Sequence, residues 1–256
     1  MKARELFEML VESAPERWKS TCDRLIAGDG EHDAKKVGVC FKLTAELVAE
    51  AAEKEIDTII THEPTFGKTD DREGAMPTDR RKWELLDRSG ITVYRFHDHA
   101  HLCEPDYIHA GFVKSMGLEI SKKYERESLG VCRYELSETT TAAALAERAR
   151  TALGIDFPRI AGDKNAPVNT VCLGLGSVGI DQIAVLENKD CDLFITGEVG
   201  EVKVLEYVRD MCFFGNKKAV LILGHFGSEY AGMRLLADTL REKGIDAEYL
   251  HGGEVY

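Results

Sequence analysis

Histidines follow three of the predicted strands, at the point where each strand ends. His62 and Glu63 come directly after the apolar segment DTIIT, His97 follows ITVYRF, and His225 follows AVLILG. In a parallel α/β sheet, ligands bind outside the carboxyl ends of the strands. We therefore expect these three imidazoles to lie at one edge of the fold.

Two of these histidines have a second polar group four residues further on. His101 follows His97 at this spacing, and Glu229 follows His225 in the first turn of a helix predicted to begin near Ser228. Imidazole nitrogens and carboxylate oxygens are ligands of Zn, Mn, Fe and Ni, and a bound ion of this kind lowers the pKa of a water ligand. The predicted metal ligands are His62, Glu63, His97, His101, His225 and Glu229. They predict a site for one or two divalent ions.

The elements that must position these residues follow an α/β pattern. Strand-length apolar runs alternate with amphipathic helical stretches, which is typical of α/β proteins with a largely parallel sheet. Strands are predicted at Val37–Phe41, Thr58–Thr61, Thr92–Phe96, Val131–Leu136, Thr170–Leu173, Leu193–Thr196, Ala219–Leu223 and Ala247–Leu250. Helices are predicted at 3–13, 44–54, 79–89, 105–116, 140–153, 178–189, 200–211 and 228–243, with Thr44 as an N-cap and Gly154 and Gly244 after helix ends.

A weak internal duplication suggests two similar α/β lobes. VCFKL, a helix and DTIITHE in the first half correspond to VCLGL, a helix and DLFITGE in the second. We predict lobes at 1–125 and 126–256, with the polar stretch Ser121–Ser128 as linker and the metal site in the cleft between the lobes. The C-terminal strand and helix are expected to pack back on the first lobe.

Five segments carry a resemblance to a known family. DTIITHEP, GITVYRFHDHAH, RIAGDKNAPVNTVCLGLGS, DLFITGEVGE and GHFGSE resemble, in order, the landmarks of the Ngg-one-interacting factor three family, whose members are also called GTP cyclohydrolase type 2 homologues. CDRLIAGD resembles the family's N-terminal Asp-Asn-x-Gly-Leu segment, with Arg24 in place of the Asn. The resemblance implies two α/β lobes around a two-metal centre and assembly as a homohexamer.

The chain departs from the family pattern at two metal positions. The family's His-His-Pro motif falls on His62, Glu63 and Pro64, and a family Asp falls on His101. The inventory of imidazoles and carboxylates is preserved, so we expect metal binding to persist with altered geometry. A carboxylate can bridge two ions, whereas a neutral imidazole offers one lone pair. The sequence is therefore compatible with a single metal ion and with two metal ions that lie further apart.

Other polar residues near these motifs have possible supporting roles. Glu198 and Glu201, in TGEVGE, match a family segment that faces the cleft, and either is a candidate for proton transfer or for orienting a ligand; both also fit as helix N-terminal carboxylates. His99 would share a face with His97 and His101 if HDHAH were extended. Asp98 is a candidate to orient an imidazole, or an exposed loop carboxylate.

A glycine-rich turn offers a competing interpretation. Gly174, Gly176 and Gly179 form G-L-G-S-V-G after a predicted strand and before a helix, the context of a dinucleotide-binding turn. Alone, this pattern would indicate an NAD(P)-linked oxidoreductase. It would leave the strand-end imidazoles unexplained. The glycines also suit a close approach of the backbone to a phosphate or to the neighbouring lobe.

Composition narrows the class of protein. The 256 residues are 44% hydrophobic and 30% charged, with a formal charge of −12, so nucleic acid is an unexpected partner. The seven scattered cysteines form no CxxC, which argues against a disulfide framework or a thiolate zinc site. Without a signal peptide or an apolar run long enough to span a membrane, the expected location is the cytoplasm.

These observations predict a metal-dependent hydrolase acting on a small molecule, for which the family name suggests a nucleotide. The expected cofactor is one or two divalent ions among Zn, Mn, Fe, Ni and Mg. A non-catalytic, homo-oligomeric metal-binding or interaction protein would use the same ligands. An open coordination position with bound water would separate the two.

Overall fold

The computed structural model describes residues 1–15, 18–67, 70–124, 130–179 and 181–253. Contacts divide the chain into two units, Met1–Ala110 with Gly232–Tyr256, and Gly111–Ala231. The first unit is thus built from two chain segments. The sequence analysis placed the lobe boundary between residues 125 and 126 and expected the C-terminal strand and helix to pack back on the first lobe.

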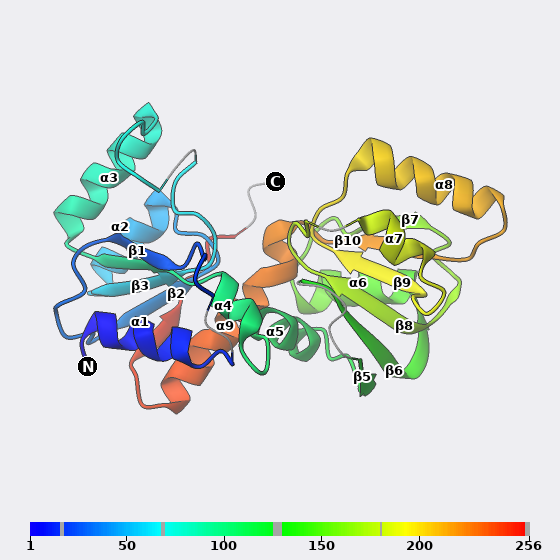
Figure 1. Ribbon diagram of the computed structural model, residues 1–256, viewed down its shortest axis with the longest axis horizontal. Coiled ribbons are helices and arrows are strands. Elements are labelled where there is room, and N and C mark those ends of the chain that lie inside the picture. The colour runs from blue at the N-terminus through cyan, green and yellow to red at the C-terminus, as the bar shows by residue number, and fades with distance from the viewer. Residues whose placement is uncertain (16–17, 68–69, 125–129, 180, 254–256) are drawn as a thin grey trace. The chain divides into compact units, whose positions relative to one another are not determined.

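The first unit contains a five-stranded sheet in the order β1-β4-β3-β2-β11 (Figure 1). Its strands are β1 (Arg24–Ala27), β2 (Val37–Cys40), β3 (Thr58–Thr61), β4 (Thr92–Arg95) and β11 (Ala247–Tyr249). Strands β4, β3, β2 and β11 run parallel, and β1 pairs antiparallel with β4. The carboxyl ends of four strands therefore meet at one edge of this sheet, and β11 returns the C-terminal segment to it.

Helices cover this sheet and carry part of the polar sequence motifs. They are α1 (Ala3–Glu12), α2 (Ala45–Glu53), α3 (Pro77–Ser89) and the short α4 (Asp98–Leu102), while α5 (Tyr107–Ser115) and α9 (His225–Glu242) contain residues of both units. Thr44 caps α2 as predicted, since its hydroxyl accepts a hydrogen bond from the Leu47 amide at 3.2 Å. Val48, Ile59 and Trp83 belong to one buried apolar cluster, which fixes α2 and α3 against the sheet.

The second unit contains a six-stranded sheet in the order β5-β6-β8-β9-β10-β7 (Figure 1). Its strands are β5 (Ile120–Lys123), β6 (Cys132–Thr141), β7 (Arg159–Gly162), β8 (Pro167–Gly174), β9 (Leu193–Thr196) and β10 (Ala219–Ile222). Only β8, β9 and β10 are parallel; β5, β6 and β7 pair antiparallel with their neighbours. The prediction of a largely parallel sheet is therefore wrong for this unit, whose class is mixed α/β.

The second unit also contains helices. They are α6 (Ala142–Ala152), α7 (Gln182–Glu187), the π-helical turn η1 (Glu201–Leu205) and α8 (Glu206–Phe213). Gly154 after α6 and Gly244 after α9 have φ of +67° and +81°. Both adopt the left-handed conformation that a helix C-terminus favours in glycine, as predicted.

The duplicated sequence segments form equivalent elements in the two units. In the first unit, helix α2 connects the parallel neighbours β2 and β3. In the second unit, helix α7 connects the parallel neighbours β8 and β9. The register pairs Cys40 with Thr61 and Gly174 with Thr196. Each unit therefore presents the residues after a Thr-ended strand at the carboxyl edge of its sheet.

Short strands with little apolar patterning were not predicted from the sequence. Each of the eight predicted strands has a counterpart, but β1, β5 and β7 were not predicted, because their side chains are mostly exposed or half-buried. Ile120–Lys123 is strand β5, so the predicted linker at Ser121–Ser128 is wrong over its first residues, and residues 125–128 lie outside the described residues.

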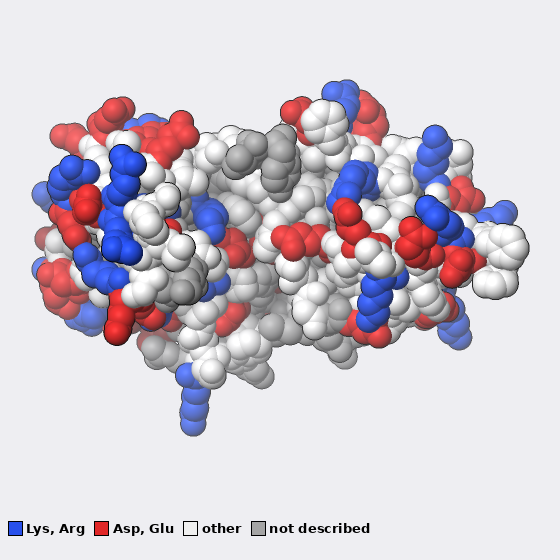
Figure 2. All heavy atoms as spheres, turned by 90° about the horizontal axis from the view of Figure 1, so that it is seen from above, with Lys and Arg blue, Asp and Glu red and all other residues white. Residues whose placement is uncertain are grey.

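Surface charge is mixed. On the face that Figure 2 shows, Lys and Arg are interspersed with Asp and Glu. Among the described helices, none combines the length and apolar character needed to cross a membrane.

Candidate metal centre

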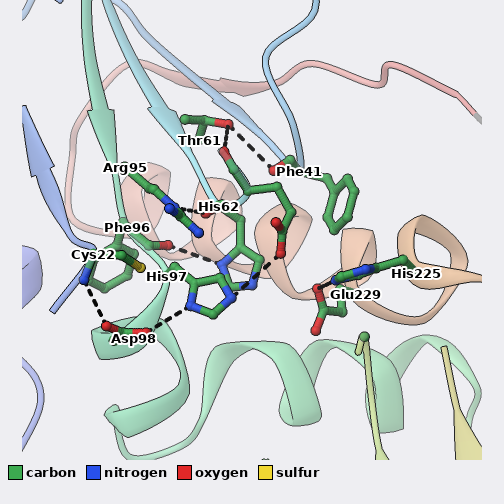
Figure 3. Close-up of polar contacts among 12 residues, drawn as sticks. Cys22, Phe41, Thr61, His62, Arg95, Phe96, His97, Asp98, His225 and Glu229 are labelled. Atoms are coloured by element: carbon green, nitrogen blue, oxygen red, sulfur yellow. Dashed lines mark hydrogen bonds and ion pairs between the residues drawn. The ribbon is translucent and has the colours of Figure 1, made fainter. Parts of the chain in front are cut away.

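Two parallel strands of the first unit deliver two imidazoles to the same place. His62 directly follows β3, and His97 follows β4 with Phe96 between them. The register of these strands pairs Thr61 with Arg95. The two rings consequently stack, with centroids 4.4 Å apart and an interplanar angle of 24°. Figure 3 shows them side by side.

Helix α4 adds a third imidazole. His97 is the residue before this helix and His101 lies one turn later, so both side chains face the same side. The His101 ring centroid is 5.2 Å from that of His62 and 5.2 Å from that of His97. One nitrogen from each of the three rings lies within 4.8 Å of the others, which makes this trio a group that could hold a metal ion. We call His62, His97 and His101 the three-histidine cluster.

An acceptor faces Nδ1 of every ring in the three-histidine cluster. Nδ1 of His62 is 3.1 Å from the carbonyl oxygen of Phe96, and Nδ1 of His97 is 2.9 Å from Oδ1 of Asp98. Nδ1 of His101 is 3.8 Å from Oδ2 of Asp106, an ion-pair distance. Acceptors at Nδ1 favour the tautomer with its lone pair on Nε2, as in metal sites whose histidines are oriented by a carboxylate or carbonyl. The residues therefore fit a divalent cation.

Glu63 places a carboxylate beside the three-histidine cluster. Its Oε1 is 3.5 Å from Nε2 of His97, and its side chain is mostly buried. Burial lowers the pKa of His97, but hydrogen bonds to Asp98, Cys22 and Glu63 outweigh it and raise the pKa to about 12. The same negative surroundings that hold a proton on this ring would stabilise a divalent cation.

Asp23 fixes the start of α4 and was missed by the sequence analysis. Its Oδ1 accepts hydrogen bonds from the backbone amides of His97 at 2.6 Å and Asp98 at 2.9 Å, and its Oδ2 accepts from the amide of His99 at 2.8 Å. A carboxylate on these amides complements the positive end of the helix. The signal was present, since Asp23 is the acid of the family-like segment CDRLIAGD.

His99 lies on the opposite side of α4 from the cluster. Because HDHAH is helical rather than extended, the shared face considered for His99 is wrong. Its Nδ1 is 2.7 Å from Oδ2 of Asp23, and its Nε2 accepts from the amide of Trp18 at 3.2 Å. His99 therefore anchors α4.

Asp106 supports His101 from the start of α5. Its carboxylate is buried and accepts from the amides of Ile108 at 2.9 Å and His109 at 3.1 Å. Burial raises the pKa of Asp106, yet the nearby His109 and His101 outweigh it and lower the pKa well below its usual value. Asp106 is thus a carboxylate at neutral pH, in contact with the ring that replaces the family's Asp.

The second unit carries polar side chains of its own. Helix α9 begins at His225, three residues earlier than predicted, so His225 and Glu229 lie one turn apart. Nε2 of His225 is 3.2 Å from Oε2 of Glu229 (Figure 3). Nδ1 of His225 is 2.7 Å from Oε1 of Glu198. Glu198 therefore orients the imidazole from the end of β9.

The glycine-rich turn has no room for a side chain at Gly176. A Cβ on Gly176 would lie 2.2 Å from Oε1 of Glu229 and 2.9 Å from Nε2 of His225, and its φ is +67°. Its amide donates to Oγ of Ser228 at 2.9 Å. The turn thus packs against the first turns of α9, and this packing accounts for the glycine without a dinucleotide.

Other candidates lie apart from these two sets. Oε1 of Glu201 is 2.6 Å from Arg159 in an exposed ion pair. Nε2 of His32 is 3.0 Å from the Thr58 hydroxyl, at the other end of β3. The structure brings His62, Glu63, His97 and His101 together in the first unit and Glu198, His225 and Glu229 together in the second.

Comparisons with known proteins agree on one family. The family model Duf34/NIF3 (NGG1p interacting factor 3) matches residues 1–251. A curated relative from Clostridium perfringens, named GTP cyclohydrolase 1 type 2 homolog, is 26% identical over 98% of this chain and 95% of its own length. A relative of the same name from Clostridium acetobutylicum is also 26% identical over the same shares.

Solved structures show the same fold. Protein SA1388 from Staphylococcus aureus matches 100% of this chain and 97% of its own with a TM-score of 0.76 at 18% identity. Reduced HcgD from Methanocaldococcus jannaschii matches 98% of this chain and 97% of its own with a TM-score of 0.72 at 17% identity. A protein titled ybgI, of unknown function, has a TM-score of 0.72 at 22% identity, covering 100% of both chains.

Proposed function

Because this chain belongs to the Duf34/NIF3 (NGG1p interacting factor 3) family, we propose that it binds a divalent metal ion and hydrolyses a nucleotide or related small molecule. One observation carries the proposal. One nitrogen of each ring in the three-histidine cluster lies within 4.8 Å of the others, and an acceptor faces each Nδ1, which favours Nε2 as the ligand atom.

The three-histidine cluster would hold the ion, with Glu63 as a further ligand from the same strand end. Catalytic zinc sites keep one position for water and can expand to five ligands, so three imidazoles with Glu63 as a fourth ligand would still leave a position for water. When bound, a divalent ion supplies an acidified water and polarises the substrate. Asp98 and Asp106 would keep His97 and His101 in the orientation that binding requires.

Proton transfer is proposed for Glu198 acting with His225. Oε1 of Glu198 is 2.7 Å from Nδ1 of His225, and the Glu198 side chain is 52% exposed, so it can exchange protons with solvent. Glu201 has weaker support as a catalytic group because its carboxylate already pairs with Arg159 at the surface.

A second part of the proposal concerns His225 and Glu229. The family resemblance implies that this pair serves the same centre as the three-histidine cluster, in a cleft between the lobes, and we propose that it provides ligands for a second ion. The close packing of Gly176 against both side chains supports a fixed geometry for the pair. The same resemblance leads us to propose a homohexamer. The cytoplasmic location expected from the sequence stays a prediction.

Elemental analysis and a hydrolysis screen test the proposal together. Protein purified without chelators is analysed for metal and assayed on nucleotides and phosphoesters with Mn, Zn, Fe, Ni or Mg. His62→Ala should lose both metal and activity. His32→Ala is the matched control, since His32 binds Thr58 at the opposite end of β3.

The outcomes of this experiment distinguish a metal-dependent hydrolase from a non-catalytic metal-binding protein. Full metal and full activity in His62→Ala would refute the proposed centre. Metal that depends on His62, with no hydrolysis in any assay, would favour a non-catalytic metal-binding protein. Loss of one of two ions in His225→Ala would support the second ion, and unchanged stoichiometry would refute it.

A further inference from the structure

Cys22 differs from most cysteines of the chain in what surrounds it. Five of the seven cysteines are buried, whereas Cys22 and Cys212 are half-buried. Cys22 precedes β1, whose partner β4 leads to His97. The Cys22 sulfur, a nitrogen of His97 and a carboxylate oxygen of Asp98 lie within 4.8 Å of one another. Figure 3 shows Cys22 and Asp98 on one side of the His97 ring.

The two nitrogens of His97 face different groups. Nε2 is 3.5 Å from Glu63, on the side of the three-histidine cluster. Nδ1 is 2.9 Å from Asp98, on the side of Cys22. One imidazole therefore stands between two sets of metal-ligating atoms.

Backbone hydrogen bonds hold the second set in place. Oδ2 of Asp98 accepts from the amide of Cys22 at 3.0 Å and from the hydroxyl of Thr21 at 2.8 Å. Asp23, the next residue, accepts from the amides of His97 and Asp98. The segment before β1 and the start of α4 are thus joined through the residues that carry the candidate ligands. All three ligand residues are half-buried, so an ion can reach them from solvent.

We propose that Cys22, His97 and Asp98 form an additional cation position, distinct from the two ions of the proposed centre, for a thiophilic divalent ion such as Zn²⁺ or Cd²⁺. Thiolate, imidazole and carboxylate are all zinc ligands, and the sulfur favours softer ions over Mg²⁺ or Mn²⁺. Zinc bond lengths in tetrahedral geometry separate such donor atoms by roughly 3.5 Å, which small side-chain rotations from the present spacing provide.

Binding there involves a definite exchange of protons. The Cys22 thiol and the His97 imidazolium each release one proton to solvent. His97 loses the proton on Nδ1 and keeps the one on Nε2, so that Nδ1 coordinates the ion. A neutral imidazole offers one lone pair. His97 therefore serves either the Cys22 position or the three-histidine cluster at one time, and the two positions compete for this ring.

Cadmium titration of the full-length protein under reducing conditions tests this proposal. Wild type should develop the ultraviolet sulfur-to-cadmium charge-transfer band. Cys22→Ser should lose it, and Cys212→Ser, which removes the other half-buried cysteine, should keep it. A wild type without the band, or a band unchanged in Cys22→Ser, would overturn the proposal.

A second arm separates this position from the three-histidine cluster. His62→Ala removes a cluster ligand and leaves Cys22, His97 and Asp98 intact, so the band should persist; its loss would mean that Cys22 does not bind cadmium independently of the cluster. Alkylation of wild-type Cys22 by iodoacetamide, located by peptide mass, should slow when cadmium is present. Unchanged alkylation would count against the proposal even if Cys22→Ser failed to fold.

Discussion

Nδ1 of His97 lies 2.9 Å from Oδ1 of Asp98, the residue that follows it in the chain. The His97 hydrogen bond lowers the pKa of Asp98 well below its usual value, although burial opposes this change. Asp98 is therefore an anion that fixes the ring, and the exposed loop carboxylate considered from the sequence is not what the structure contains.

Asp98→Asn is expected to weaken metal binding at the three-histidine cluster by about 10–100-fold, the usual cost of removing a carboxylate that orients a ligand histidine. Competition with a metal indicator measures the change. Asp190→Asn alters an exposed ion pair with Arg133 in the other unit and should leave affinity unchanged. Equal affinities in wild type and Asp98→Asn would contradict the role of Asp98.

Glu198→Gln is expected to reduce kcat at least about 10-fold with little change in KM, at the low end of what a proton-transfer group contributes. The amide cannot accept the proton, and it no longer fixes the tautomer of His225. Steady-state kinetics on a substrate found in the screen measures the effect. Glu201→Gln is the matched control; if it impaired kcat more than Glu198→Gln, our assignment would be reversed.

Gly176→Ala is expected to lower the free energy of unfolding by at least about 1–2 kcal/mol, because an alanine is strained at the positive φ of this residue. The contact with Glu229 adds to this cost. Gly179→Ala is the control, since a Cβ there meets nothing within 4 Å. Denaturant titration of both variants decides the matter, and equal stabilities would show that the turn tolerates a side chain at position 176.

The buried Lys82 should make the free energy of unfolding change with pH in the alkaline range. Burial, together with the charge of Lys42, lowers its pKa from 10.5 to about 8, while its ammonium donates to the carbonyls of Leu43 and Thr65. Between these pKa values the unfolded chain binds more protons than the folded one, so rising pH favours folding. The unfavourable contribution is fully present below pH 8 and disappears as the pH rises to 10.5.

The measurement compares wild type with Lys82→Met across this range. The stability of wild type relative to the variant should rise by at most about 1.4 kcal/mol per pH unit. Lys189→Met, at an exposed position, serves as control. A difference that stays flat, or falls, between these pH values would show that the ammonium is not destabilised by burial.

Much of the fold could be predicted from local sequence patterns. The strand Thr58–Thr61, the cap at Thr44 and the glycines after helices depend on residues close in sequence, so the pattern of apolar and turn residues predicted them. The short strand β7 and helix α4 were missed, because their residues form those elements only through contacts with distant segments.

The sequence by itself determined which side chains stand at strand ends, and so the identity of the candidate ligands His62, His97 and His225. Only the tertiary structure decided what supports them. Asp23 reaches α4 across more than seventy positions of chain, Gly176 makes room for Glu229, and Cys22 comes to lie beside His97. Residue type and local spacing specify a ligand, but its orientation depends on hydrogen bonds and packing between segments far apart in the chain.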